Sequence, residues 1–284
     1  MKQPFLIGIG GAHSGSGKTT IAVAILKAVT SNEKSVSSQC QSVKVSKCQS
    51  VKYSDTLTLG NSDTSKDSLL ATRYSLLNKR WGAIKYTKTA FYSSIIDNKS
   101  ILCQEDKDTK KLLGAGAEEV LWVQSPANEI NEVLPMAIDR LSHFDGIIIE
   151  GNSAIEFLKP DIVIFLLGFR TKRIKPSAQA VFEHADIIVC DDLPVAAELL
   201  KNKKLQPQIF SLSSLNIKEL IISMEAVIQK KEIARTLKDS ASLNVISCSL
   251  ARKIAEDLGA AYSDVGKAAD DFEIKIRNCE LDCF

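Results

Sequence analysis

The chain has 284 residues, more than a typical single domain needs, so we expect one sizeable core with an appendage. Apolar residues make up 45% and charged residues 25%, as in globular proteins, and the net charge of +2 argues against a general nucleic-acid coat. The apolar stretches are too short to cross a bilayer, and seven scattered cysteines, an odd number, favour reduced thiols. These features predict a cytoplasmic protein with no signal peptide and no membrane anchor.

The first predicted elements are a short apolar strand, a glycine-rich loop and a helix. Residues 5–9 (FLIGI) form the strand, and residues 12–19 (AHSGSGKT) follow the spacing of a phosphate-binding P-loop, with Ala12 in place of its usual first glycine. From residue 19 onward, apolar residues recur as in a helix packed on a sheet. A glycine-rich turn with an exposed lysine is the alternative, but the flanking strand and helix favour a nucleotide phosphate site.

The loop residues have distinct expected roles. Gly15 and Gly17 let backbone N–H groups turn toward an anion at the positive end of the following helix. We expect Lys18 to reach the β- and γ-phosphates, the Thr19 hydroxyl to bind Mg²⁺, and Thr20 to lie near the α-phosphate. The predicted nucleotide-binding residues of the loop are Ser14, Gly15, Ser16, Gly17, Lys18, Thr19 and Thr20.

Residues 33–80 interrupt this pattern. They contain a tandem repeat, residues 40–47 (CQSVKVSK) followed by residues 48–55 (CQSVKYSD), and are rich in serine, lysine and glutamine. Such a segment buries little apolar surface, so we expect a mobile surface insertion that ends in a short helix near residues 68–77. Its two cysteines have no nearby histidine or CxxC spacing, which favours a solvated loop over a metal site.

Strands and helices alternate along the rest of the chain up to about residue 235. Continuous Ile and Val runs, rather than in-out alternation, predict a parallel sheet covered on both faces. The expected fold over residues 1–235 is therefore an α/β P-loop NTPase, with a mainly parallel sheet between two layers of helices. Further strands are predicted at 81–86, 120–123, 146–149, 162–167, 187–189 and 208–210, and helices at 105–116, 130–141, 177–184, 194–200 and 217–231.

Acidic residues follow predicted strands at points where a P-loop needs partners for its metal and nucleotide. Glu150 ends the strand GIIIE, and we expect it beside the P-loop as a ligand of Mg²⁺ or of its water, rather than as a strand-end cap. Asp108 begins a helix, where it serves either the metal or only the helix N-terminus. Asp192 follows a late strand and either contacts guanine or caps a helix, while Lys85 could help hold an anion. The predicted catalytic residues are Lys18, Asp108 and Glu150, and the predicted metal ligands are Thr19, Asp108 and Glu150.

Several of these segments together resemble the GTP-binding protein B family of molybdopterin-guanine dinucleotide biosynthesis. The likeness covers about residues 4–32 and 81–225 and is carried, in order, by AHSGSGKTT, IKYTKT, DKDTKKLLGAGAEEV, FDGIIIEGN and IIVCDDLP. It implies a protein that binds GTP with Mg²⁺, hydrolyses GTP weakly and assists a partner nucleotidyltransferase that joins GMP to the molybdenum cofactor. It also implies phosphate contacts from residues 15–20, a Mg²⁺ role for Asp108 and Glu150, and a base contact from Asp192.

Departures from this family leave the partner surface open. The family's basic, histidine-containing stretch is here residues 85–88 (KYTK), without histidine, and the insertion and everything past about residue 235 lie outside the resemblance.

An ATP-dependent ligase or kinase of the dethiobiotin synthetase type is an alternative function of another class. Such enzymes place an acidic residue just ahead of the P-loop glycines, and this chain has His13 there, which argues against the alternative. A non-catalytic nucleotide-dependent regulator is a third hypothesis. No Asn-Lys-x-Asp motif follows a strand, so ATP remains an alternative to GTP, and a homodimer is possible.

Residues 240–284 predict a small helical C-terminal module. One helix is expected over ISCSLARKIAEDLG, starting near Ser247 or Ser249 and ending at Gly259, and a second at 263–269. The spacing resembles a helix-turn-helix, but the second helix is acidic, so packing or partner docking is favoured over nucleic-acid binding.

The module also contains cysteines in and after its helices. Cys248, Cys279 and Cys283 could bind zinc, an iron–sulfur centre or a molybdenum species. Two thiols in a frayed tail are the favoured interpretation, because no third and fourth ligand are evident.

Overall fold

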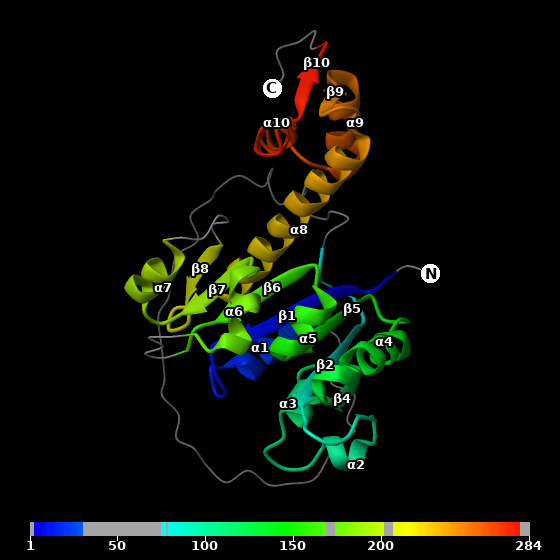
Figure 1. The fold of residues 1–284 in the computed structure, drawn as a ribbon, viewed down its shortest axis with the longest axis vertical. Coiled ribbons are helices and arrows are strands. Elements are labelled where there is room, and N and C mark those ends of the chain that lie inside the picture. The colour runs from blue at the N-terminus through cyan, green and yellow to red at the C-terminus, as the bar shows by residue number, and fades with distance from the viewer. Residues whose placement is uncertain (1–2, 31–74, 78, 169–173, 202–206, 279–284) are drawn as a thin grey trace, which may run out of the picture.

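The computed structural model describes residues 3–30, 75–77, 79–168, 174–201 and 207–278. The tandem repeat and most of the predicted insertion lie outside these ranges. The helix predicted at 68–77 lies outside them too, except for residues 75–77, which are not helical. Cys279 and Cys283 are likewise outside the described residues. The described chain forms a large α/β layer and a small C-terminal module (Figure 1).

The α/β layer is built on a sheet of eight strands among the described residues, in the order β3-β4-β2-β5-β1-β6-β7-β8. Neighbouring strands run parallel except at β3, which is antiparallel to β4. The mainly parallel sheet is thus confirmed, whereas the edge strand β3 has no counterpart among the predicted strands. The strands are β1 (Phe5–Gly11), β2 (Trp81–Lys88), β3 (Ser94–Ile96), β4 (Glu119–Ser125), β5 (Gly146–Glu150), β6 (Ile162–Leu166), β7 (Ile187–Cys190) and β8 (Gln208–Ser211).

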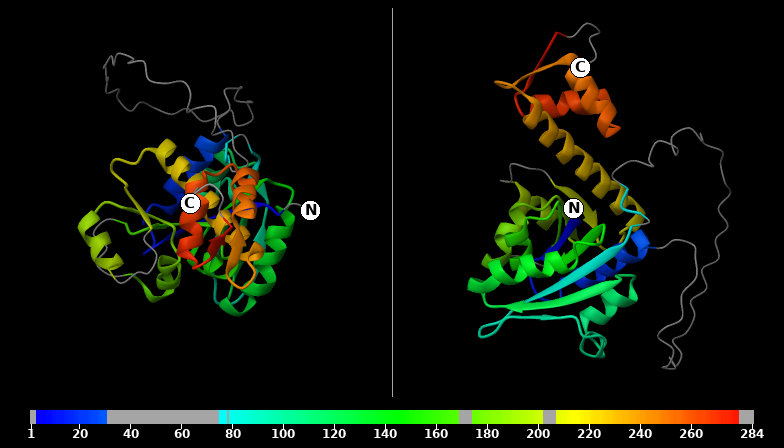
Figure 2. Two further views of the ribbon diagram at one scale, coloured as in Figure 1. Left: turned by 90° about the horizontal axis from the view of Figure 1, so that it is seen from above. Right: turned by 90° about the vertical axis from the view of Figure 1, so that its right-hand side faces the viewer.

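Helices cover both faces of this sheet, as predicted (Figures 1 and 2). One face packs against α1 (Lys18–Thr30), α3 (Asp108–Gly114) and α8 (Ile217–Ser240). The other face packs against α4 (Ile130–Arg140), α5 (Asn152–Leu158), α6 (Pro176–Glu183) and α7 (Leu193–Leu200). Two short helices, α5 and α2 (Lys99–Leu102), and a single 3₁₀ turn (Ala127–Glu129) were not expected from the sequence pattern.

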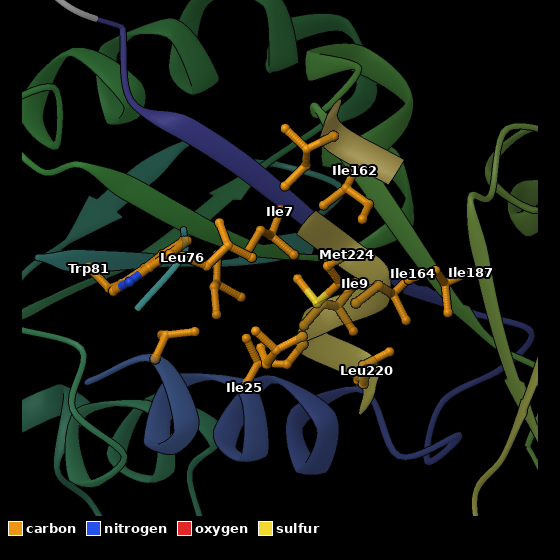
Figure 3. Packing of buried hydrophobic residues seen from close by; sticks show 14 of the residues in the cluster. Ile7, Ile9, Ile25, Leu76, Trp81, Ile162, Ile164, Ile187, Leu220 and Met224 are labelled. Atoms are coloured by element: carbon orange, nitrogen blue, oxygen red, sulfur yellow. The ribbon is translucent and has the colours of Figure 1, made fainter. Parts of the chain in front are cut away.

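Side-chain alternation along the central strands decides which residues face α1. Ile7 and Ile9 of β1 lie against Ile25 of α1 and Met224 of α8 (Figure 3), and all four side chains are fully buried. Burial of each such side chain stabilises the fold by about 2 kcal/mol relative to its exposure. In β5, Ile148 belongs to this layer and its neighbour Ile149 to the opposite one, so the next residue, Glu150, returns to the α1 side.

The start of β5 tests how tightly this core is packed. A Cβ added at Gly146 would lie 2.3–2.7 Å from ring carbons of Trp81, whose side chain is fully buried. We therefore expect Gly146→Ala to lower the free energy of unfolding by about 2 kcal/mol in urea titrations. Gly114→Ala is the matched control, since a Cβ there meets nothing within 4 Å. It should leave stability unchanged or raise it slightly, and an equal loss in both variants would contradict this packing.

Helix α8 connects the sheet to the C-terminal module. It spans 24 residues, and in Figures 1 and 2 it extends away from the sheet and carries the module near its far end. The expected boundary at residues 235–240 therefore falls inside a continuous helix. Across the ranges that the structure describes, none of the helices combines the length and the apolar character that crossing a bilayer requires.

The module consists of two helices and a small parallel sheet packed on the end of α8. Its helices are α9 (Cys248–Leu258) and α10 (Tyr262–Asp271), and its strands are β9 (Val245–Ser247) and β10 (Lys275–Arg277). The predicted ends of α9 are confirmed, since the Ser247 hydroxyl accepts the Leu250 N–H and Gly259 ends the helix in the left-handed region. Lys230 of α8 pairs with Asp271 at 3.3 Å, and Lys238 lies over the Phe272 ring. The two strands were not predicted.

A half-buried carboxylate on α8 gives the fold a specific pH dependence. Glu225 Oε1 accepts the Leu76 backbone N–H at 2.8 Å, and burial raises the pKa of Glu225 above 4.5, although that hydrogen bond and Lys79 partly oppose the shift. An acid whose pKa is raised by folding binds more protons in the folded state, so its contribution to stability falls as pH rises through 4.5 and the raised pKa.

Glu225→Gln keeps a carbonyl acceptor for Leu76 and removes this titration. We expect the variant to gain stability relative to the parent as pH rises from 4 to 7. Below the pKa that Glu225 has in the unfolded chain, the two proteins should be equally stable. Thermal unfolding of both proteins across this range measures the difference. A difference that shrinks with rising pH would be the wrong sign.

Candidate functional site

A polar pocket lies at the carboxyl edge of the sheet, where β1, β2 and β5 end. Its volume is about 490 Å³. Strand ends, the loop between β1 and α1, and the first residues of α3 and α5 meet there, as expected for parallel strands whose carboxyl ends share one edge. The lining residues are Gly11, Ala12, His13, Ser14, Gly15, Gly17, Lys18, Thr19, Thr20, Lys85, Asp108, Lys111, Glu150, Asn152, Lys175 and Ser177.

The loop between β1 and α1 has the backbone geometry that an anion cradle needs. Gly15 and Gly17 have φ values of +79° and +92°, a region that favours glycine, and α1 begins immediately afterwards at Lys18. Ala12 is buried, is not among the residues with positive φ, and donates its N–H to the Leu166 carbonyl at 2.9 Å. The alanine is therefore compatible with the loop, because this position needs a small side chain and not a glycine conformation.

Lys18 is held over the loop by its own chain. Its Nζ donates to the His13 carbonyl at 3.0 Å and lies 3.5 Å from the hydroxyl of Ser16. Ser16, which was predicted to bind the nucleotide, is buried within the loop and does not line the pocket. Burial lowers the pKa of Lys18, with Glu150 opposing and Lys85 reinforcing the shift. The ammonium is thus partly desolvated and bonded only to neutral oxygens, so an anion in the pocket would find a strong charge partner.

Glu150 links the end of β5 to the start of α1. It is 1% exposed, and both of its carboxylate oxygens accept from the Thr19 hydroxyl, at 3.0 and 2.9 Å. Strand register brings in a third residue, since Lys85 of β2 lies directly opposite Glu150 and its Nζ donates to Oε1 at 2.5 Å. The predicted proximity of Glu150 to the loop between β1 and α1 is therefore present in the structure.

Asp108 joins the same cluster from the first turn of α3. Its Oδ2 accepts from Lys85 at 2.8 Å, and its Oδ1 lies 3.3 Å from Lys111 one turn along the helix. Burial alone would lower the pKa of Lys85, but the charges and hydrogen bonds of Glu150 and Asp108 outweigh it and raise the pKa. Burial likewise acts to raise the pKa of Asp108, and the two lysines more than offset that effect, so its pKa is lowered. Lys85 is therefore charged between two carboxylates.

Asn152 is a site residue that sequence reasoning missed. Its Nδ2 donates to the Gly11 carbonyl at 2.9 Å and its Oδ1 accepts the Gly11 N–H at 3.0 Å, so α5 is bonded to the point where β1 becomes the loop. Its position two residues after the strand-end glutamate was the available signal. Lys175 and Ser177, at the start of α6, also line the pocket and were not predicted, since nothing in their local sequence marks them.

Asp192 does not line the pocket. It follows β7, and its Oδ1 accepts the Val195 N–H at 3.1 Å as the N-cap of α7. The helix-capping alternative thus describes its contacts in this structure, and its role toward a nucleotide base stays a prediction. Cys248 is buried at the start of α9, and the thiolate cluster, the less favoured alternative for these cysteines, stays untested because its other two members lie outside the described residues.

The oxygen donors of the pocket fit a hard divalent cation whose remaining ligands come from a bound molecule. Carboxylate and hydroxyl oxygens, from Glu150, Asp108 and Thr19, are the type that Mg²⁺ prefers. In the described ranges, no group of three or more His, Cys, Asp and Glu side chains is arranged to hold a metal. A cation at this position therefore needs further oxygens, as a nucleotide's phosphates would provide.

No protein-family model and no curated protein matches the chain.

Proposed function

We propose that this protein binds a guanine nucleotide with Mg²⁺ at a P-loop, hydrolyses it slowly, and assists a partner enzyme in molybdenum cofactor maturation in the cytoplasm. The observation that carries the nucleotide part is the bonding of Thr19 at the start of α1 to Glu150 at the end of β5, with Lys18 poised over the loop. The glycine-rich loop, Lys18 and Glu150 line one pocket, which supports a phosphate cradle with a lysine and a metal ligand beside it.

The phosphate site supports hydrolysis only weakly by itself. Lys18 and the loop amides would neutralise charge on the transferred phosphoryl group, and Thr19 and Glu150 would position Mg²⁺. In the described chain, the side chains around the pocket include one histidine, His13, whose Nδ1 is within 2.8 Å of the Ser14 carbonyl, and no arginine. A partner that adds a positive charge would accelerate such a reaction strongly, which is why we propose a slow intrinsic rate.

The choice of guanine and of the cofactor pathway depends on the sequence resemblance. Asp192, the residue proposed to contact the base, caps α7 in this structure. The C-terminal module offers a surface separate from the nucleotide pocket, which suits docking to a nucleotidyltransferase or another maturation partner.

The charge of the pocket supports a second candidate, a small-molecule ligase or kinase. Four lysines, Lys18, Lys85, Lys111 and Lys175, line the pocket with two carboxylates. This excess of positive charge would suit an anionic second substrate beside a nucleotide.

Turnover assays distinguish the two candidates. The intact protein, supplied with Mg²⁺ and either GTP or ATP, should release phosphate from GTP far more slowly than about 1 s⁻¹. Lys18→Ala, measured in parallel, should remove even this activity and so exclude a contaminating phosphatase. Rapid ATP consumption that depends on an added amine or carboxylate substrate would reject the GTPase proposal in favour of the ligase.

A further inference from the structure

The metal-binding oxygens of the pocket are already engaged by a cation of the chain itself. Lys85 Nζ lies 2.5 Å from Glu150 Oε1 and 2.8 Å from Asp108 Oδ2. The Thr19 hydroxyl donates to both oxygens of the same Glu150 carboxylate. Each side chain that P-loop chemistry would offer to Mg²⁺ thus bonds to Lys85 or to another member of this cluster.

This ammonium is a built-in counterion, because Glu150 cannot easily stay charged without one. The Glu150 side chain is 2% exposed and that of Lys85 is 19% exposed, so both charges are largely removed from water. A buried carboxylate without a partner cation is strongly unfavourable. The strand register fixes the pair, because Lys85 and Glu150 are directly opposed on neighbouring parallel strands.

We infer that Lys85 holds the metal position as an internal cation until a nucleotide-borne divalent ion displaces it. Metal alone would compete with this ammonium for the two carboxylates of the pocket, and among the described residues no third carboxylate lines it. A metal that arrives with phosphates gains their oxygens as ligands, and Lys85, on the wall of the same pocket, is then free to face the anionic ligand. Metal and nucleotide therefore bind together, and metal alone binds weakly. This inference rests on the proposed phosphate site.

A titration with Mn²⁺ alone, followed by electron paramagnetic resonance of the free ion, tests the competition. We expect Lys85→Met to bind Mn²⁺ at least about tenfold more tightly than the parent, since a competing charge is removed. Lys85→Arg keeps the charge and should stay as weak as the parent. Lys88→Met is the matched control, an exposed lysine three residues along β2 that does not line the pocket, and its Mn²⁺ affinity should equal the parent's.

Thermal unfolding keeps the test decisive if Lys85→Met folds poorly. Without Lys85, Glu150 loses its bonded cation and Asp108 keeps its pairing with Lys111, so Mn²⁺ should restore stability or folding to this variant and leave the parent unchanged. The double variant Lys85→Met/Glu150→Gln should lose most of this stabilisation by Mn²⁺, because it lacks the Glu150 carboxylate. Equal Mn²⁺ affinity in the parent and Lys85→Met, or no rescue by millimolar Mn²⁺, would overturn the inference.

The outcomes separate this inference from the proposed function. Nucleotide binding that depends on Lys18, together with no gain of Mn²⁺ binding in Lys85→Met, would reject the role of Lys85 alone. A gain of Mn²⁺ binding in a protein that binds no nucleotide would reject the proposed function and confirm the competition between Lys85 and the metal.

Discussion

Lys18→Ala is expected to weaken nucleotide binding about a hundredfold, a loss of about 3 kcal/mol for a charge-assisted contact to phosphate. The reason is the position of the side chain, which lies over the loop with its Nζ bonded to the His13 carbonyl and partly shielded from water. No other lysine of the described chain bonds to the loop backbone in this way. Calorimetric titration of the parent and the variant with Mg²⁺ and nucleotide measures the ratio.

Lys27→Ala is the matched control for this prediction. Lys27 lies on the same helix, in its last turn, is exposed, and does not line the pocket. Its removal lowers the net charge by the same amount. A loss of nucleotide affinity that both variants share would therefore come from the overall charge and not from a contact in the loop. If Lys18→Ala binds nucleotide as tightly as the parent does, the loop is not a phosphate site.

Glu150→Ala is expected to destabilise the ligand-free protein by about 3 kcal/mol. The change leaves the half-buried ammonium of Lys85 with Asp108 as its remaining carboxylate and removes the acceptor of the Thr19 hydroxyl. Urea unfolding of the parent and the variant gives the difference in free energy of unfolding.

Asp108→Ala supplies the comparison for this change. It removes the other carboxylate of Lys85, but one whose side chain is 36% exposed, and a partly solvated ion pair of this kind contributes about 1 kcal/mol or less. Glu150→Ala should therefore cost clearly more than Asp108→Ala. Equal losses, or a Glu150→Ala protein as stable as the parent, would mean that the buried Lys85–Glu150 pair contributes no more to stability than the partly exposed Lys85–Asp108 pair.

The parts of the fold that could be predicted from sequence are those with a strong local signal. The apolar runs of β5 and β6 and the caps of α9 at Ser247 and Gly259 are visible in the sequence, and the structure has them where expected. The short elements β3, α2, β9 and β10 span three or four residues each, too few to show a periodicity. Helix α5 begins two residues after Glu150 and spans seven residues, about two turns, so it shows little helical periodicity of its own.

Most of the loop, Glu150 and Asp108 were predictable as members of the site, whereas Asn152, Lys175, Ser177 and the bonding within the site were not. The predicted loop residues other than Ser16 line one pocket together with Glu150 and Asp108, because parallel strands end at a common edge of the sheet. That Lys85 lies opposite Glu150 depends on the strand order β2-β5-β1, which is set by crossover connections between distant segments and not by local sequence. A lysine expected to hold an anion therefore turned out to bond two carboxylates of its own chain.

A titration of the intact protein with GTP and with ATP, each with Mg²⁺, tests the central claim most directly. The proposed function predicts saturable binding of GTP at one site per chain, at least about tenfold tighter than binding of ATP. Tighter binding of ATP would keep the phosphate site and reject the guanine assignment. Failure of both nucleotides to bind at millimolar concentration would contradict the account of this pocket as a nucleotide site.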